Sequence, residues 1–397
     1  MAKSTDGLAW RFTGPEVHGL RGPVGDVLWL GFSLADQQER AVLEAGLRMV
    51  DPDTVEHQGG WLLVRDDVAI NRDAVTAFLE VVGDEDSHWY LGGRSGQFGR
   101  EIGFDDSVPW LVWLAPGGEI SMERIQQTKP IEVDPQERTI HYPISVNGRP
   151  TIVELPLTSR VVLPTSHWVQ LLWANLLGLA PYLWRRLVGK NAVDILFTVL
   201  KAIIRTRSTD PFRIATRLGR MGTGCQIHPS AVVEGCWLGD NVHIGANAVV
   251  RGCVLADDVS VEDLALVEFS VLGVGATIQR QAMCKFSVVS KGGAVAGAIQ
   301  LGVMGTHSSI KRGAFLMDMA LGKDVRIEVD GALQPAPLGL VGVCLGAGTV
   351  VGAGVKVAAG RVIPSNLQIV SGADVVTQVP KDASGRFIVA NGTLEPL

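Results

Sequence analysis

Residues 238–279 read "LGDNVHIGANAVVRGCVLADDVSVEDLALVEFSVLGVGATIQ" and place an aliphatic residue at roughly every sixth position, with Gly, Ala, Asp and Asn between. An amphipathic helix would place apolar residues at i, i+3, i+4 and i+7, and a half-buried strand would alternate at every second residue. Neither period fits. The stretch therefore indicates a backbone that turns after every five or six residues.

The repeat is clearest in the aliphatic residues that are followed, four places later, by a residue that is mostly small or β-branched. These leading residues are Ile227, Val233, Leu238, Ile244, Val250, Leu255, Val261, Val267, Leu272 and Ile278. The steps between them are 6, 5, 6, 6, 5, 6, 6, 5 and 6 residues, which gives a repeat of 17. Three short rungs per turn predict a parallel β-helix, because each flat side is a short strand and each corner a tight turn.

The pattern also sets the expected domain boundaries. It is interrupted after residue 290, resumes at Leu345 and ends at Pro364. We therefore predict a β-helix over residues 221–370, an inserted loop at about residues 291–339, and a tail over residues 371–397.

These rungs resemble the left-handed β-helix hexapeptide-repeat acyltransferases, over roughly residues 221–370. The resemblance implies transfer of an acyl group from acetyl-CoA or another acyl donor, and a homotrimer with active sites in the clefts between subunits. Residues 345–361, "LGAGTVVGAGVKVAAGR", are similar to the family's C-terminal coils, whose small side chains leave room for a pantetheine arm. The resemblance implies that Lys356 and Arg361 contact its phosphates.

Residues 1–165 alternate strand-like and helical segments. "DVLWLGF" is followed by "SLADQQERAVLEAGL", which starts with a Ser N-cap, and "GWLLVRDDVAI" is followed by "NRDAVTAFLEVVG". This order predicts an α/β domain with a mainly parallel sheet. Further on, "RTIHYPISVNGRPTIVELPL" predicts a β-hairpin that turns at residues 147–148.

Two segments of the front half resemble sugar nucleotidylyltransferases, in several of which a hexapeptide β-helix follows. "LLVRDDVAINRDAVTAFLEVV" is similar to the family's strand that ends in Asp, and "HWVQLLWANLLGL" to a segment after its nucleotidyl domain. The resemblance assigns Asp67 to nucleotide and metal binding and Asn175 to a structural role. The family's Gly-rich loop with Arg and its Pro-Lys pair are missing, which indicates an inactive domain. Mg²⁺ is expected only if the domain is active.

Residues 166–220 predict a basic, amphipathic helical linker. The segment from Trp168 to Arg220 contains nine Lys or Arg and only two Asp, although the net charge of the whole chain is −6. One interpretation is a pair of interfacial helices that lie on anionic lipid. The other is that the apolar faces pack against the two flanking domains. The uncharged run over residues 168–184 is shorter than a membrane-spanning helix requires.

Acyl transfer needs a base that takes a proton from the acceptor, and His has the most suitable pKa. His307 lies in the expected insertion, within "GTHSSIKRG", where Lys311 and Arg312 offer charge for phosphates. His243 is expected to face outward from its rung, with Ser260 and Thr277 as its neighbours one and two coils on. Either His is a candidate catalytic base. The alternative for His243 is a surface side chain without a role, and the alternative for His307 is a solvated turn.

Composition excludes other classes. A net charge of −6 argues against a nucleic-acid partner, and a three-His metal site lacks its third ligand, since His228 and His243 stand alone on the coils. The first residues, "MAKSTDGLAWRFTG", carry no apolar core of signal-peptide length, which predicts a cytoplasmic protein. Five Cys fit a reduced compartment, and Cys236 and Cys253 are expected to stack one coil apart.

The sequence therefore leads to a hexapeptide-repeat acyltransferase that acts on a nucleotide sugar or a related acceptor. A non-catalytic binding or scaffold protein that docks partners or membrane is the first alternative, and an active sugar-1-phosphate nucleotidylyltransferase the second.

Overall fold

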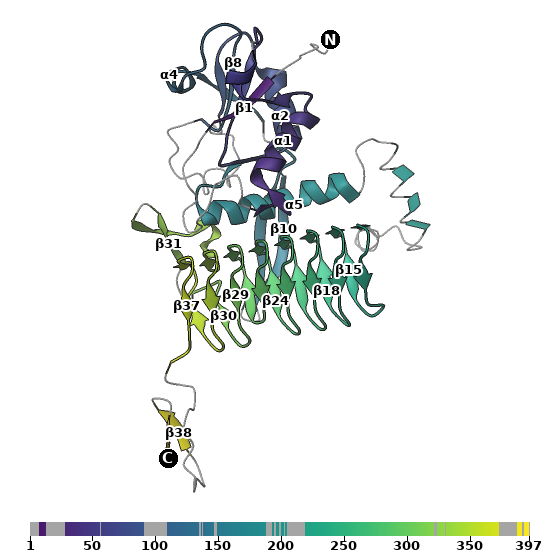
Figure 1. Cartoon of the computed structure of the whole chain (residues 1–397), viewed down its shortest axis with the longest axis vertical. Coiled ribbons are helices and arrows are strands. Elements are labelled where there is room, and N and C mark those ends of the chain that lie inside the picture. Colours follow the sequence, from purple (N-terminus) through teal and green to yellow (C-terminus); the bar gives the residue numbers. More distant parts are fainter. Residues whose placement is uncertain are drawn as a thin grey trace.

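The computed structural model of the chain shows an N-terminal α/β domain, a long helix and a β-solenoid (Figure 1). The structure describes residues 8–12, 28–55, 57–90, 109–134, 136, 138–146, 149–187, 193, 196–197, 200–201, 203–204, 219–320, 324–329, 331–372, 387–390 and 393–396. Of the expected C-terminal tail, it describes residues 371–372 and a hairpin of β38 (Phe387–Ala390) and β39 (Thr393–Pro396).

The N-terminal domain is built on a six-stranded sheet with the strand order β4-β1-β5-β8-β7-β9. Its strands are β1 (Leu8–Phe12), β4 (Arg48–Met49), β5 (Trp61–Arg65), β7 (Ser87–Tyr90), β8 (Leu111–Leu114) and β9 (Lys129–Glu132). Three of the five pairings are parallel and two are antiparallel, so the sheet is mixed where a mainly parallel one was expected. Both antiparallel pairings involve β8, which lies between β5 and β7 and runs in the opposite direction to both.

The expected strand-helix order is confirmed at both N-caps of this domain. Helix α1 (Leu34–Glu44) begins after Ser33, whose hydroxyl accepts from Asp36 N. Helix α2 (Arg72–Val81) begins after Asn71, whose Oδ1 accepts from Ala74 N. The smaller elements are α4 (Met122–Gln126), β6 (Val68–Ile70), β12 (Val162–Pro164), the 3₁₀ turn η2 (Pro52–Thr54), and the paired strands β10 (Arg138–Val146) and β11 (Arg149–Leu157). The register of β10 and β11 confirms the hairpin.

The segment "DVLWLGF" does not form the expected single strand. Leu30 and Gly31 have positive φ angles of 49° and 87°, and the chain reverses there. The result is a short hairpin of β2 (Leu28–Trp29) and β3 (Phe32–Ser33) outside the main sheet. This hairpin contacts the long helix.

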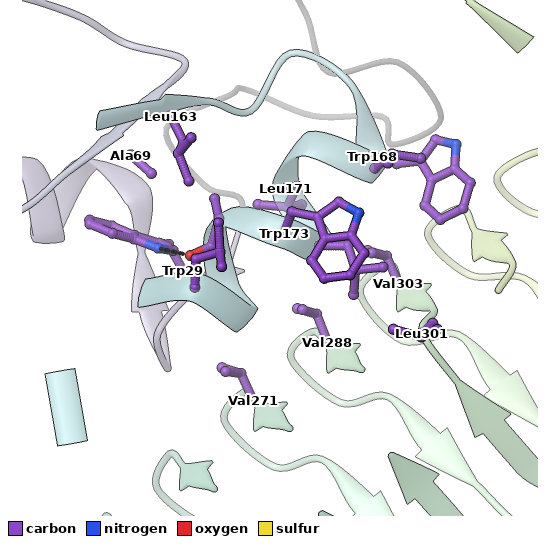
Figure 2. Close-up of a cluster of buried hydrophobic side chains, with 14 of the residues drawn as sticks. Trp29, Ala69, Leu163, Trp168, Leu171, Trp173, Val271, Val288, Leu301 and Val303 are labelled. Atoms are coloured by element: carbon purple, nitrogen blue, oxygen red, sulfur yellow. Dashed lines mark hydrogen bonds between the residues drawn. The ribbon is translucent and has the colours of Figure 1, made fainter. Parts of the chain in front are cut away.

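Helix α5 (Trp168–Leu187) lies between the two domains. Trp168, Trp173 and most leucines of the helix are buried against Trp29 and Leu163 on one side and against Val271, Val288 and Val303 of the solenoid on the other (Figure 2). The helix therefore joins both domains through one hydrophobic core. This arrangement confirms, for residues 168–183, the interpretation in which the apolar faces pack against the flanking domains.

The solenoid has three faces, each a parallel sheet, and the 17-residue repeat is confirmed by the register in which Gln226 pairs with His243 and His243 with Ser260. Face A contains β13 (Arg220–Met221), β16 (Trp237–Leu238), β19 (Val254–Leu255), β22 (Val271–Leu272), β25 (Val288–Val289), β28 (Val303–Met304), β33 (Cys344–Leu345) and β36 (Val362–Ile363). Face B contains β14 (Gln226–Ile227), β17 (His243–Ile244), β20 (Ser260–Val261), β23 (Thr277–Ile278), β26 (Ala294–Val295), β29 (Ser309–Ile310), β34 (Val350–Val351) and β37 (Gln368–Ile369). Face C contains β15 (Val232–Glu234), β18 (Val249–Arg251), β21 (Leu266–Glu268), β24 (Met283–Lys285), β27 (Ala298–Gln300), β30 (Phe315–Leu316) and β35 (Lys356–Val357).

The insertion expected at about residues 291–339 begins later than the sequence indicated. Strands β26 to β30 continue the coils through Leu316, and the insertion follows with β31 (Arg326–Val329), β32 (Ala332–Pro335) and the 3₁₀ turn η3 (Pro337–Gly339). The repeat shortens to 15 residues where Ala294 pairs with Ser309, because the corner between β26 and β27 is tighter. Gly297 sits in that corner, and a Cβ there would collide with Ala314 O.

Candidate functional site

His307 lies on the corner between faces A and B, between β28 and β29, and not in an insertion. Its backbone N–H donates to Lys291 O one coil back, at 2.9 Å, and its φ is 55°. The residues at the same place in the other coils also have positive φ: Gly224, Asn241, Asp258, Gly275, Gly292, Gly348 and Asn366. Gly, Asn, Asp and His are the residues that tolerate this conformation best, so the corner accepts a histidine without a rearranged backbone.

The imidazole of His307 is exposed and lies against Gly292 of the preceding coil. A Cβ at position 292 would collide with Nδ1, so a glycine there makes room for the ring. Of its two neighbouring hydroxyls, Ser308 is buried and donates to Gly305 O at 2.7 Å, while Ser309 faces outward from face B. Within the described residues, the ring has no hydrogen-bond partner, which leaves both nitrogens available to a ligand.

Three of the predicted cations lie on the coil of His307 or on the next one. Lys311 and Arg312 are exposed on the next corner, between faces B and C, beyond the two-residue strand β29. Lys356 is exposed on face C one coil further, where it pairs with Phe315. His307 and these cations therefore flank the same coils of the solenoid.

Arg361 lies elsewhere. It is exposed on the corner between faces C and A, and its guanidinium contacts Arg326 O of the insertion at 3.4 Å. The structure therefore does not bring Arg361 together with the other three cations.

His243 faces outward from face B and is exposed, and its predicted neighbours Ser260 and Thr277 are confirmed. Its strand β17 and strand β29 are separated by four steps in the sheet order. At roughly 4.8 Å between neighbouring strands, His243 and His307 of one subunit lie about 19 Å apart along the solenoid axis. The two histidines therefore cannot serve one catalytic centre within a subunit.

Asp67, the predicted nucleotide ligand, is fully buried in the turn between β5 and β6. Its Oδ2 accepts from Arg65 Nη2 at 3.0 Å, and its main-chain oxygen accepts from Thr165. A buried carboxylate that is neutralised by a buried arginine holds a fold together and is not open to a triphosphate. Asn175 has the structural role assigned to it: its side chain bonds to Leu28 O, Leu30 N and Leu171 O.

One hollow was not indicated by the sequence. It lies between α1, the start of α2 and the end of α5, and four arginines line it: Arg40, Arg72, Arg185 and Arg186. The only sequence signal was the Arg185–Arg186 pair directly after an uncharged run.

Comparison with known proteins identifies the repeat. Residues 220–252 match the protein-family model described as bacterial transferase hexapeptide (six repeats). No curated protein matches the chain. The matched residues form the first coils, from β13 to β18, and a hexapeptide-repeat β-helix is typical of transferases such as acyltransferases. The match lies within the C-terminal domain and leaves the resemblance of residues 1–165 to nucleotidylyltransferases unsupported.

Two further searches were confined to the part of the chain that the structure describes. There, no group of three or more His, Cys, Asp or Glu side chains is arranged to hold a metal ion. Among the same residues, no helix combines the length and the apolar character needed to cross a bilayer.

Proposed function

We propose that the chain is a hexapeptide-repeat acyltransferase, which moves an acetyl or longer acyl group from coenzyme A or an acyl carrier to a nucleotide sugar or related acceptor. The observation that supports this most directly is the exposed imidazole of His307 on a solenoid corner, with Lys311 and Arg312 on the adjoining corner. The hexapeptide repeat supports the reaction class.

In this proposal His307 is the general base. Its imidazole removes the proton from the acceptor hydroxyl or amine, and the acceptor attacks the thioester carbonyl. The carbon–sulfur bond then breaks, and the imidazolium returns the proton to the departing thiolate. Lys311, Arg312 and Lys356 would bind the donor's phosphates as exposed charges. Arg361 lies on the corner between faces C and A, so it would contact only a part of the donor that reaches that corner.

The test compares two histidines that the solenoid holds apart. His307→Asn suits the corner, because Asn occupies the same position in other coils, so the fold should be kept. We expect the release of free thiol from acetyl-CoA, measured with a chromogenic disulfide, to fall at least about 100-fold, as for the loss of a general base. His243→Asn is the matched control and should retain activity. Equal activity in wild type and His307→Asn would reject this role.

The proposed assembly is a homotrimer whose clefts hold the acceptor. Face C carries a partly exposed apolar row, formed by Val232, Val249, Leu266, Met283, Ala298 and Phe315. An apolar row of this length, beside the neutralised charge ladder of Glu234, Arg251, Glu268 and Lys285, is suited to burial against another subunit.

A second candidate function is attachment to an anionic membrane through the linker, and one observation favours it. Five large apolar side chains at helical spacing, Val193, Leu196, Phe197, Leu200 and Ile204, are each between 48% and 67% exposed. The linker around them carries an excess of positive charge. An apolar stripe beside basic residues is the composition of an interfacial helix. The stripe lies after α5, so the buried residues 168–183 take no part.

Vesicle flotation tests this attachment. We expect the protein to float with vesicles rich in phosphatidylglycerol at low salt, and to lose binding at high salt because the charges are screened. Phe197→Glu with Leu200→Glu should abolish flotation. Leu43→Glu changes an equally exposed apolar residue on α1 and is the control, which should still float with the vesicles. If the wild-type protein stays at the bottom of the gradient, the membrane proposal fails.

A further inference from the structure

The hollow at the seam between the N-terminal domain and α5 has an uncompensated positive charge. Its lining includes four arginines and two acids, Glu44 and Asp73. Both acids are already paired with Arg185, at 3.4 and 3.0 Å. Within the described residues, Arg40, Arg72 and Arg186 have no carboxylate partner. Three guanidinium groups around one small hollow repel each other unless an anion neutralises them.

Two buried polar atoms of the hollow lack hydrogen-bond partners among the described residues: Arg72 Nε and the Tyr182 hydroxyl. Gln37 is close enough to the Tyr182 hydroxyl to lower its pKa, but the two side chains do not reach hydrogen-bond geometry, and the Gln37 amide donates to Trp29 O at 3.5 Å. Buried polar groups are almost always paired, so unpaired ones indicate a missing water, ion or ligand. Burial raises the pKa of Tyr182, and Arg186, Arg40 and Arg220 oppose that rise. The hydroxyl therefore stays a neutral donor.

The size of the hollow limits what it holds. Its volume is about 70 Å³, which fits a group of a few heavy atoms such as a phosphate. The N-terminus of α2 also lines it at Asn71 and Arg72, and a helix N-terminus favours negative charge. Arg186 and Arg40 are held in place over the rings of Tyr182 and Phe32.

We propose that this hollow is a binding site for a phosphate-sized oxyanion, held by Arg72, Arg186, Arg40 and the Tyr182 hydroxyl. Because β2, α1, α2 and α5 meet there, the anion would also fasten the N-terminal domain to the helix that packs on the solenoid. The oxyanion is either free in solution or part of a phosphomonoester headgroup of a lipid, since both present the same oxygens.

The first arm of the test uses the whole chain and inorganic phosphate. We expect phosphate to raise the thermal unfolding temperature relative to chloride at equal ionic strength, since a ligand that binds only the folded state stabilises it. Arg72→Gln with Arg186→Gln should weaken phosphate binding, measured by calorimetry, by at least about tenfold. Arg48→Gln, an exposed arginine of β4, is the control and should bind as the wild type does.

Tyr182→Phe separates a ligand role from a structural one. It removes an unpaired hydroxyl, so the protein without phosphate should be as stable as the wild type or more so, while its response to phosphate should fall. The second arm replaces phosphate by vesicles that contain phosphatidic acid: binding there that depends on Arg72 and Arg186, without a response to inorganic phosphate, assigns the anion to a lipid. If neither ligand binds, or if the variants respond as the wild type does, the site is refuted.

Discussion

His307 shows how a single residue is selected by backbone conformation. The corner between faces A and B needs a positive φ, and the residues found there are Gly, Asn, Asp and one His. The sequence made His307 a candidate but placed it in an insertion, because the shortened corner at Gly297 breaks the 17-residue repeat just before it. Only the strand pairing shows that the coil continues.

The cysteines of the solenoid give a prediction at the same scale. Cys253 and Cys284 are fully buried, and burial raises the pKa of Cys253 well above its ordinary value and that of Cys284 to about 12. At Cys236 burial opposes the thiolate, but hydrogen bonds with Cys253 lower the pKa overall; its side chain is, however, only 1% exposed. Since a thiolate must also be accessible to react, we expect only the partly exposed Cys225 to react rapidly with iodoacetamide between pH 7 and 9. Mass spectrometry of the labelled native protein measures this. Rapid labelling of Cys284 would contradict the packed interior.

At the scale of the element, α5 is apolar on most sides because it faces two domains. A helix of this composition is buried, and the sequence alone could not distinguish burial in protein from contact with lipid. The structure decides in favour of protein over residues 168–183, where the aliphatic residues at the outward positions of face A, Val254, Val271, Val288 and Val303, meet the helix. The sequence did not indicate this: the residue four places after the leading one was expected to point inward, but Val254 and Val271 belong to the cluster around α5 and not to the interior of the coils.

Asn175 is the polar residue that fixes α5 to the β2–β3 hairpin. Its three hydrogen bonds, at 2.8 to 3.0 Å, satisfy the main chain of Leu28, Leu30 and Leu171. We expect Asn175→Ala to lower the free energy of unfolding by about 2 to 4 kcal/mol, because it leaves buried main-chain groups unpaired. Trp184→Ala, at an exposed position of the same helix, should cost less than about 0.5 kcal/mol. Urea denaturation compares the two, and an equal cost would contradict this role.

For the whole molecule, the three faces of the solenoid differ in what covers them. Face A is covered by α5, face B presents the polar side chains of His243, Ser260, Thr277 and Ser309, and face C presents the apolar row. Face A is therefore occupied by the protein's own helix, so that face C is available to another subunit and face B to ligands.

The apolar row of face C predicts how a charged substitution changes the oligomeric state. In a homotrimer that buries face C, Leu266→Asp would place a charge in the interface without a partner, and we expect the oligomer to dissociate. Ser260→Asp makes the same change on face B and should leave the assembly intact. Sedimentation velocity at several concentrations measures both. A trimer that persists in Leu266→Asp would show that face C is not the interface.

The sequence by itself determined the solenoid, because the period of the inward aliphatic residues sets the number of residues per coil and the corners admit few residue types. It also determined the Ser33 N-cap of α1, which is local. The tertiary structure alone decided that the sheet is mixed, that α5 is shared by two domains, that Asp67 is buried beside Arg65, and that arginines from α1, α2 and α5 meet around one hollow. These features depend on contacts between residues far apart in the chain, and no local pattern of residue types specifies which distant partner a side chain will meet.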